Sequence, residues 1–211
     1  GNRYEQDGTV YVGGIVGFPG AIWGKVESCV NYGNVNVISG DYAFCGGICG
    51  QEGDVIESVN YGNISAETMS HWTGPSYARN CNVGGITGTE RAEVSYSVNY
   101  GNVYSYAHKE ASSCAGGIMG YRGGNVEYSV NVGKSITSIE QKEDEENEGV
   151  YRDVDGECGR IVAEPNNSIG GISACYSIDS TLCNNQIPGE KIGENNINGK
   201  SIEEEEIDNL I

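Results

Sequence analysis

The chain has 211 residues, of which 33 are Gly, 4 are Pro and 8 are Cys, and its net charge is −18 with 37% hydrophobic residues. A charge of this sign repels phosphate backbones and anionic lipid headgroups, which excludes nucleic-acid binding. Excess Gly without a Gly-X-Y period excludes collagen and indicates many tight turns. The chain lacks an apolar run of about 18 residues, so we expect no direct insertion into a membrane.

Two short blocks alternate along residues 12–179 and define five repeat units. The first block is a Gly doublet followed by Ile, as in VGGIVG, CGGICG, VGGITG and AGGIMG, with the weaker copy CGRIVA. The second block follows each copy, as in ESCVNYGN, ESVNYGN, YSVNYGN and YSVNVGK. The units lie near residues 12–44, 45–82, 83–114, 115–157 and 158–179, and residues 180–211 follow as a C-terminal cap.

Within each unit, apolar and polar residues alternate over short stretches, which is the period of β-strands. A unit of three short strands separated by Gly turns fits one coil of a solenoid, whose coils bury an apolar face only by stacking. We therefore predict a mainly β fold, a parallel β-solenoid of about five coils. A right-handed β-helix is expected from the usual rule for parallel crossovers. Unit lengths differ after the second block, so unequal loops are expected on one face.

Equal positions of successive coils lie about 4.8 Å apart, so like residues are expected to form ladders. The predicted interior ladder is Ile15, Ile48, Ile86, Ile118 and Ile161. A predicted ladder at a turn is Asn31, Asn60, Asn99 and Asn131, with Asp179 in the same register. Two tyrosine files are predicted at the surface: Tyr32, Tyr61 and Tyr100, and then Tyr96, Tyr128 and Tyr176.

These units resemble the GLUG repeat, Gly-Gly-Leu/Ile-Val-Gly followed by Asn-Cys/Ser-Tyr-Asn-x-Gly-x-Val, which occurs in bacterial surface and secreted proteins and beside immunoglobulin A proteases. The resemblance covers residues 12–179 and is weakest in the fifth unit, where Arg160 replaces the second Gly and Ala163 the closing one. It implies an extracellular or bacterial cell-surface protein with a repeat β-architecture. It does not imply catalysis, because such repeats are usually stalks or adhesive modules.

Few residues could carry catalysis or bind a metal. The chain has only His71 and His108, and neither belongs to a zinc motif; the sequence around Asp153–Glu157 fails the calcium-loop templates. We therefore predict no enzyme activity, no metal and no cofactor. The alternative is a glycan-active enzyme of the parallel β-helix type, for which Glu57 and Glu127 are expected at equal positions with Glu27 beside them.

Four cysteines precede a Gly doublet or its degenerate copy by one to three residues, so they are expected near one edge of the stack: Cys45, Cys81, Cys114 and Cys158. They either form disulfides between neighbouring coils or make a file of small buried thiols, and the second interpretation is favoured. A Cys175–Cys183 disulfide that staples the C-terminal cap is a further hypothesis.

Aromatic residues outside the ladders are the candidates for ligand binding: Trp23, Tyr42, Phe44, His71, Trp72, Tyr77, Tyr104, Tyr106 and Tyr121. The favoured residue is Trp72, in the polar insertion Thr68–Asn82, and His71, Tyr77 and Trp23 complete the predicted set. The predicted function is a non-catalytic, monomeric adhesin or structural module whose inter-repeat loops hold a host glycan or an extracellular protein. A passive spacer is the remaining alternative.

Two further segments have a predicted structure. The acidic run Glu143–Glu148 is expected to be a solvated insertion. Ser201 as N-cap, with Glu residues in the first turn, predicts a short helix over Glu203–Leu210. This helix is expected to cover the open end of the last coil with Ile202, Ile207, Leu210 and Ile211.

Overall fold

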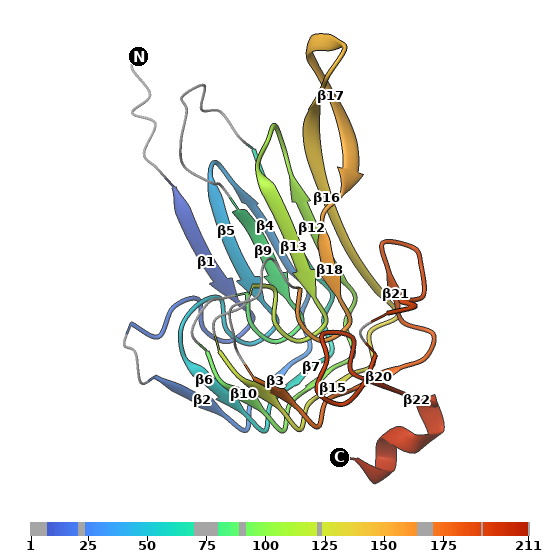
Figure 1. The fold of residues 1–211 in the computed structure, drawn as a ribbon. Helices are drawn as coiled ribbons and strands as arrows, with labels where there is room; N and C mark the ends of the chain where they lie inside the picture. Colours follow the sequence, from blue (N-terminus) through green and yellow to red (C-terminus); the bar gives the residue numbers. More distant parts are fainter. Residues whose placement is uncertain are drawn as a thin grey trace.

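The computed structural model describes residues 8–20, 24–69, 80–88, 92–121, 124–163, 171–190 and 192–210. The chain winds into stacked coils whose strands pair in parallel with those of the next coil, so the predicted β-solenoid of about five coils is confirmed (Figure 1). In the described ranges there is no α-helix, and no helix is long and apolar enough to cross a membrane.

Each coil contributes strands to four sheets, one strand more per coil than the sequence pattern predicts. Sheet 1 consists of β1 (Thr9–Gly13), β5 (Tyr42–Gly46), β9 (Asn80–Gly84), β13 (Ser112–Gly116) and β18 (Glu157–Gly159). Sheet 2 consists of β2 (Lys25–Glu27), β6 (Asp54–Ile56), β10 (Val94–Ser95), β14 (Val126–Glu127) and β19 (Ile172–Ser173).

Sheet 3 consists of β3 (Val30–Asn31), β7 (Val59–Asn60), β11 (Val98–Asn99), β15 (Val130–Asn131), β20 (Tyr176–Ile178) and β22 (Lys200–Ile202). Sheet 4 consists of β4 (Val35–Ser39), β8 (Ile64–Thr68), β12 (Val103–Ala107), β16 (Ser135–Asp144) and β17 (Asn147–Asp155), and β21 (Leu182–Cys183) also pairs with β16. The β16–β17 pair is antiparallel, and its hairpin rises above the other coils (Figure 1).

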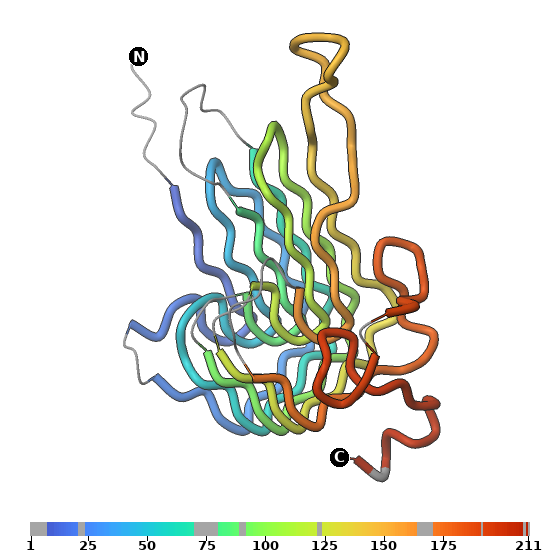
Figure 2. The backbone as a smooth tube through the Cα atoms, in the orientation of Figure 1, coloured from blue at the N-terminus to red at the C-terminus, as the bar shows by residue number. Residues whose placement is uncertain are grey.

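Figure 2 shows the coil in two parts, a flat arm made by sheets 1 and 4 and a rounded base made by the Gly turns and sheets 2 and 3. Alternation explains the arm, because in β4 the side chains of Val35 and Val37 are buried whereas those of Asn36 and Ile38 are exposed. One apolar cluster, which includes Val83, lies between the two sheets of the arm.

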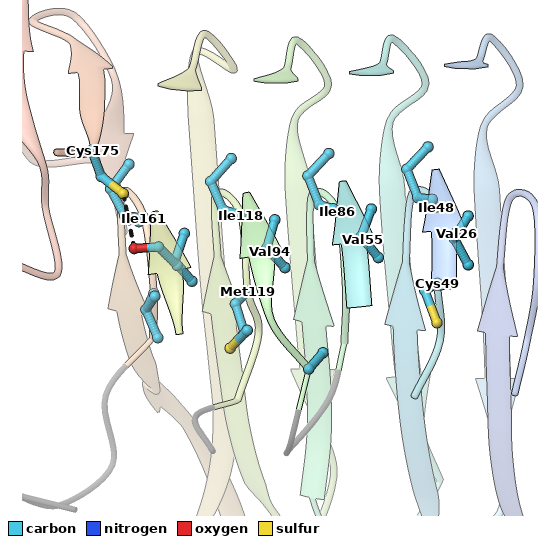
Figure 3. Close-up of a cluster of buried hydrophobic side chains, with 13 residues drawn as sticks. Val26, Ile48, Cys49, Val55, Ile86, Val94, Ile118, Met119, Ile161 and Cys175 are labelled. Atoms are coloured by element: carbon cyan, nitrogen blue, oxygen red, sulfur yellow. Dashed lines mark hydrogen bonds between the residues drawn. The ribbon is translucent and has the colours of Figure 1, made fainter. Parts of the chain in front are cut away.

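A second apolar cluster fills the base, where the isoleucines of successive coils form a file (Figure 3). Four of the five predicted residues are fully buried: Ile48, Ile86, Ile118 and Ile161. Ile15 is 47% exposed, so the prediction that it lies in the interior is wrong. It belongs to the first coil, and a solenoid side chain is covered only when a coil lies on both sides of it.

The asparagine ladder is confirmed for its first four members. The side-chain amide of Asn60 donates to Asn99 Oδ1 at 2.8 Å, and Asn31 and Asn99 make the equivalent bond to their own successors. The Gly doublets leave room for this ladder, since a Cβ on Gly85 would lie 2.3 Å from Asn99 Cγ and 2.1 Å from a carbonyl oxygen.

The register of the fifth coil differs from the prediction. Ser177, not Asp179, pairs with Asn131, and Tyr176 pairs with Val130. Tyr176 therefore does not continue the file of Tyr96 and Tyr128, whose place Ala174 takes: all three residues have the same left-handed backbone, with φ near 50°. The positions predicted for Tyr176 and Asp179 in the fifth unit are thus displaced by two residues from their structural positions.

The C-terminal helix is a 3-10 helix, η1 (Glu204–Asn209), capped by Glu203, so the prediction of Ser201 as N-cap is wrong. Ser201 lies in β22 instead. In the segment before β22, the backbone oxygen of Ile197 accepts hydrogen bonds from the backbone N–H groups of Ile161 and Val162. The segment around Ile197 therefore covers the last coil. The helix places Ile207 in a separate apolar cluster with Val98, Val130, Val132, Ile178 and Ile202.

Candidate functional site

The predicted binding residues fall where the structure gives no description. Trp23 lies in residues 21–23, and His71, Trp72 and Tyr77 lie in residues 70–79, outside the described residues. Among the other aromatic candidates, Tyr104 and Tyr106 stand on a described strand of sheet 4. They define the surface considered next.

The outer face of sheet 4 carries a cluster of aromatic and polar side chains. In β12 the side chains of Val103, Ser105 and Ala107 are buried, so Tyr104 and Tyr106 point outward. Tyr104 is 40% exposed, and its ring plane is within 7° of that of Tyr106 at a centroid distance of 6.4 Å. The pair presents aromatic surface on a sheet whose backbone is held by coils on both sides.

Neighbouring coils bring polar groups to this pair. Register places Glu67 of β8 beside Tyr106, and Glu67 Oε1 lies 2.5 Å from His108 Nε2. The imidazole of His108 meets the Tyr106 ring edge-on, with centroids 4.6 Å apart. Glu67 and His108 keep 38% and 24% of their side-chain surface exposed, so both are accessible from solvent.

The β16–β17 hairpin supplies the other side of the cluster. Tyr106 Oη donates to Asp153 Oδ1 at 2.8 Å, and Gln141 Nε2 lies 3.3 Å from the same oxygen. Partial burial of the phenol, together with this hydrogen bond and the negative charge of Asp153, raises the pKa of Tyr106 to about 12. The pKa of Tyr104 is also raised, mainly by burial of its phenol and in addition by the negative charges of Glu67 and Asp153. Both phenols therefore remain neutral at physiological pH.

We name this cluster, Glu67, Tyr104, Tyr106, His108, Gln141 and Asp153, the sheet-4 patch. Its carboxylates accept hydrogen bonds from hydroxyl groups, its amide can donate or accept, and its rings offer apolar contact. Within the described parts of the chain, no group of three or more His, Cys, Asp and Glu residues could hold a metal ion. The arrangement is suited to bind a polyhydroxylated ligand.

The tyrosine ladder on sheet 3 is a different kind of aromatic surface. Tyr32, Tyr61 and Tyr100 stack with centroids 5.2 and 4.8 Å apart and ring planes within 2° and 11°, as predicted. The ring faces that these tyrosines turn toward each other are therefore covered by the neighbouring ring. A sugar stacks on a free ring face, so this ladder offers mainly ring edges and hydroxyl groups.

The glutamates considered for an enzyme are not at equal positions. Glu127 is in register with Ser95 and, one coil further, with Ile56. Glu57, one residue after Ile56, shares the left-handed place of Tyr96 and Tyr128. The predicted equivalence of Glu57 and Glu127 is therefore wrong.

All eight cysteines are free thiols, but Cys158 is half-buried, so the four cysteines do not form the file of buried thiols that the favoured interpretation expects. The predicted four lie in strands of sheet 1, but in several register files, since Cys45 pairs with Val83 whereas Cys81 pairs with Ala43. The Cys175–Cys183 staple is wrong: Cys175 packs in the core of the base and Cys183 against the core of the arm. Burial raises the pKa of Cys175 to about 11.

The acidic run Glu143–Glu148 is mostly exposed, as expected for a solvated insertion, and it forms part of the β16–β17 hairpin. The side chain of Asp144 is 4% exposed and pairs with Arg152 across the hairpin. Glu143 Oε1 accepts the backbone N–H of Gly149, and Glu110 Oε1 accepts that of Glu143. These contacts fix the hairpin that positions Asp153.

Residue counting could have located part of the sheet-4 patch. Asn60 and Asn99 are in register, and both Glu67 and Tyr106 follow their asparagine by seven residues. Asp153 could not be placed in this way, because it returns along the antiparallel strand of a hairpin that, among the described residues, is found in the fourth unit alone. Comparison of the chain with protein-family models, curated proteins and solved structures finds no match.

Proposed function

We propose that this chain is a non-catalytic bacterial cell-surface or secreted repeat module that binds a host glycan or an extracellular protein. The observation that carries this proposal is the sheet-4 patch, in which the exposed Tyr104 and the half-buried Tyr106 are flanked by two carboxylates and an amide on a strand that pairs on both sides. Its polar groups can pair with sugar hydroxyls, and the Tyr104 ring provides a surface for the apolar face of a sugar. The repeats' resemblance to GLUG units supports the extracellular assignment.

The geometry favours a neutral or cationic ligand over an anionic one. Glu67 and Asp153 both face the cluster, and the whole chain carries a net charge of −18. An anionic sugar would be repelled by these two carboxylates at short range and by the net negative charge of the chain at long range. The proposed glycan class is therefore uncharged hexose-containing chains, with a cationic protein segment as the other ligand that fits the charge.

The test is binding of the purified chain to a glycan and mucin array, with calcium and again with a chelator. We expect chelator-insensitive binding that Tyr104→Ala abolishes and Glu67→Gln weakens. Tyr128→Ala is the matched control, because Tyr128 is also half-exposed and Ala174 occupies the same left-handed place in the next coil. This control should bind like the wild type.

Three outcomes would contradict the proposal. Binding that persists in Tyr104→Ala but is lost on deletion of residues 70–79 would move the site to the insertion that the sequence favours. Sugar release from a polysaccharide panel would favour the enzyme alternative. Folded protein that binds neither a glycan nor a cationic peptide panel would indicate a passive spacer.

A further inference from the structure

The eight cysteines differ in burial and in the partners of their thiols. Five are buried: Cys45, Cys49, Cys81, Cys114 and Cys175. The remaining three, Cys29, Cys158 and Cys183, keep part of their surface in solvent. Ser58 of the following coil lies next to Cys29, and its hydroxyl accepts a hydrogen bond from the backbone N–H of Cys29. Cys29 therefore has a hydroxyl rather than a thiol as its neighbour there.

The other two half-buried thiols meet across the arm. Cys158 lies in β18, the last strand of sheet 1, and Cys183 lies in β21, which pairs with β16 of sheet 4. Cys158 Sγ lies 3.4 Å from Ile136 O, and Ile136 is the register partner of Cys183. Both side chains pack against the same apolar cluster, and the neighbouring Cys183 thiol, together with burial, raises the pKa of Cys158.

We propose that Cys158 and Cys183 are an oxidation site, at which an intramolecular disulfide ties the last strand of sheet 1 to the facing strand of sheet 4. A low-molecular-weight disulfide such as oxidised glutathione is the oxidant. One protein thiolate attacks it and releases one glutathione thiol, and the second protein thiol then displaces the other glutathione from the mixed disulfide. Two protein thiols become one disulfide, and one oxidised glutathione becomes two reduced ones.

The position of this pair gives the bond a structural consequence. Among the described strands of sheet 1, β18 pairs with β13 alone, and β21 pairs with β16 on one side. Terminal strands of a solenoid lose their contacts first, because each has a neighbour on one side only. A covalent link between these two strands encloses residues 159–182 and holds the fifth coil closed. The inference does not depend on the proposed ligand binding.

The experiment uses the full chain incubated with oxidised or with reduced glutathione, then alkylated under denaturing conditions. We expect the free-thiol count to fall from eight to six and peptide mapping to find one cross-linked pair, Cys158 with Cys183. Oxidation should raise the urea midpoint of unfolding, and a dithiol reductant should reverse the increase. Cys158→Ser and Cys183→Ser should each prevent the cross-link.

Cys29→Ser is the matched control, since Cys29 is also half-buried and should not affect the cross-link. Eight alkylated thiols in oxidised, folded protein would refute the proposal. So would stable glutathione adducts without a cross-link, or a disulfide that joins other cysteines. The wild-type thiol count is decisive even where a serine variant fails to fold.

Discussion

Arg160 and Ser177 occupy the positions that Gly117 and Asn131 hold one coil earlier. Gly117 cannot carry a side chain, because its Cβ would lie 2.6 Å from Asn131 Cγ. The smaller Ser177 does not impose this restriction. The fully buried guanidinium of Arg160 donates to three acceptors: Asn198 O, Ile178 O and Ser201 Oγ. The two residues that make the fifth unit a poor sequence match therefore compensate for each other.

This compensation predicts coupled mutations. Ser177→Asn alone should lower the free energy of unfolding by about 2 kcal/mol, because the larger side chain has to displace the packed Arg160. Arg160→Gly alone leaves its three acceptors without their donor and should cost more. Their combination restores the Gly–Asn pair and should cost at least about 1 kcal/mol less than the sum. Urea unfolding of the four proteins measures the coupling, and strict additivity would show that the pair is independent.

The buried asparagine ladder predicts strong sensitivity to charge. Asn99 Nδ2 donates to Gly101 O and Asn131 Oδ1, while its Oδ1 accepts from Gly101 N and Asn60 Nδ2. Asn99→Asp places an oxygen where these two acceptors need a donor, and should lower the free energy of unfolding by about 3 kcal/mol or more at pH 7. Asn36→Asp is the control, because Asn36 is exposed and should change stability by less than about 0.5 kcal/mol. Equal effects of the two variants would contradict the ladder.

The Gly doublets predict a contrast between two glycine substitutions. Gly85→Ala should destabilise the protein by about 3 kcal/mol or more, because the Cβ would meet the backbone oxygen of Gly117 at 2.1 Å. A Cβ on Gly40 meets nothing within 4 Å, so Gly40→Ala should change stability by less than about 1 kcal/mol. Thermal unfolding followed by far-UV circular dichroism measures both. A tolerated Gly85→Ala would indicate a looser coil spacing than the structure has.

The sheet-4 patch predicts a stability change at high pH. The pKa of Tyr106 is raised to about 12 in the folded protein, above the ordinary value of about 10 expected after unfolding. The folded state therefore holds this proton more tightly, and the associated stability is present below pH 10 and is lost as pH rises toward 12. Tyr106→Phe should reduce the downward slope of the unfolding free energy between pH 10 and 12. Asp153→Asn should lower the pKa of Tyr106 in a spectrophotometric titration, and an unchanged value would remove Asp153 as a contributor.

The sequence by itself determined the solenoid and its regular interior. Four consecutive units repeat the Gly doublet, the isoleucine and the asparagine, and stacking places equal positions next to each other. The buried Ile48 file and the Asn60 ladder follow directly from that periodicity. The tyrosine stack follows in the same way, since Tyr32, Tyr61 and Tyr100 each come directly after a ladder asparagine.

Tertiary structure decided the features in which one unit differs from the next. The exposure of Ile15 depends on its place in the terminal coil, and the pairing of Ser177, rather than Asp179, with Asn131 depends on how the fifth coil folds back. The contact of Tyr106 with Asp153 and the approach of Cys158 to Cys183 join residues that a hairpin or a whole coil separates in sequence. Periodicity fixes what repeats, whereas contacts across unequal connections depend on how each connection folds back, for which the repeat provides no rule.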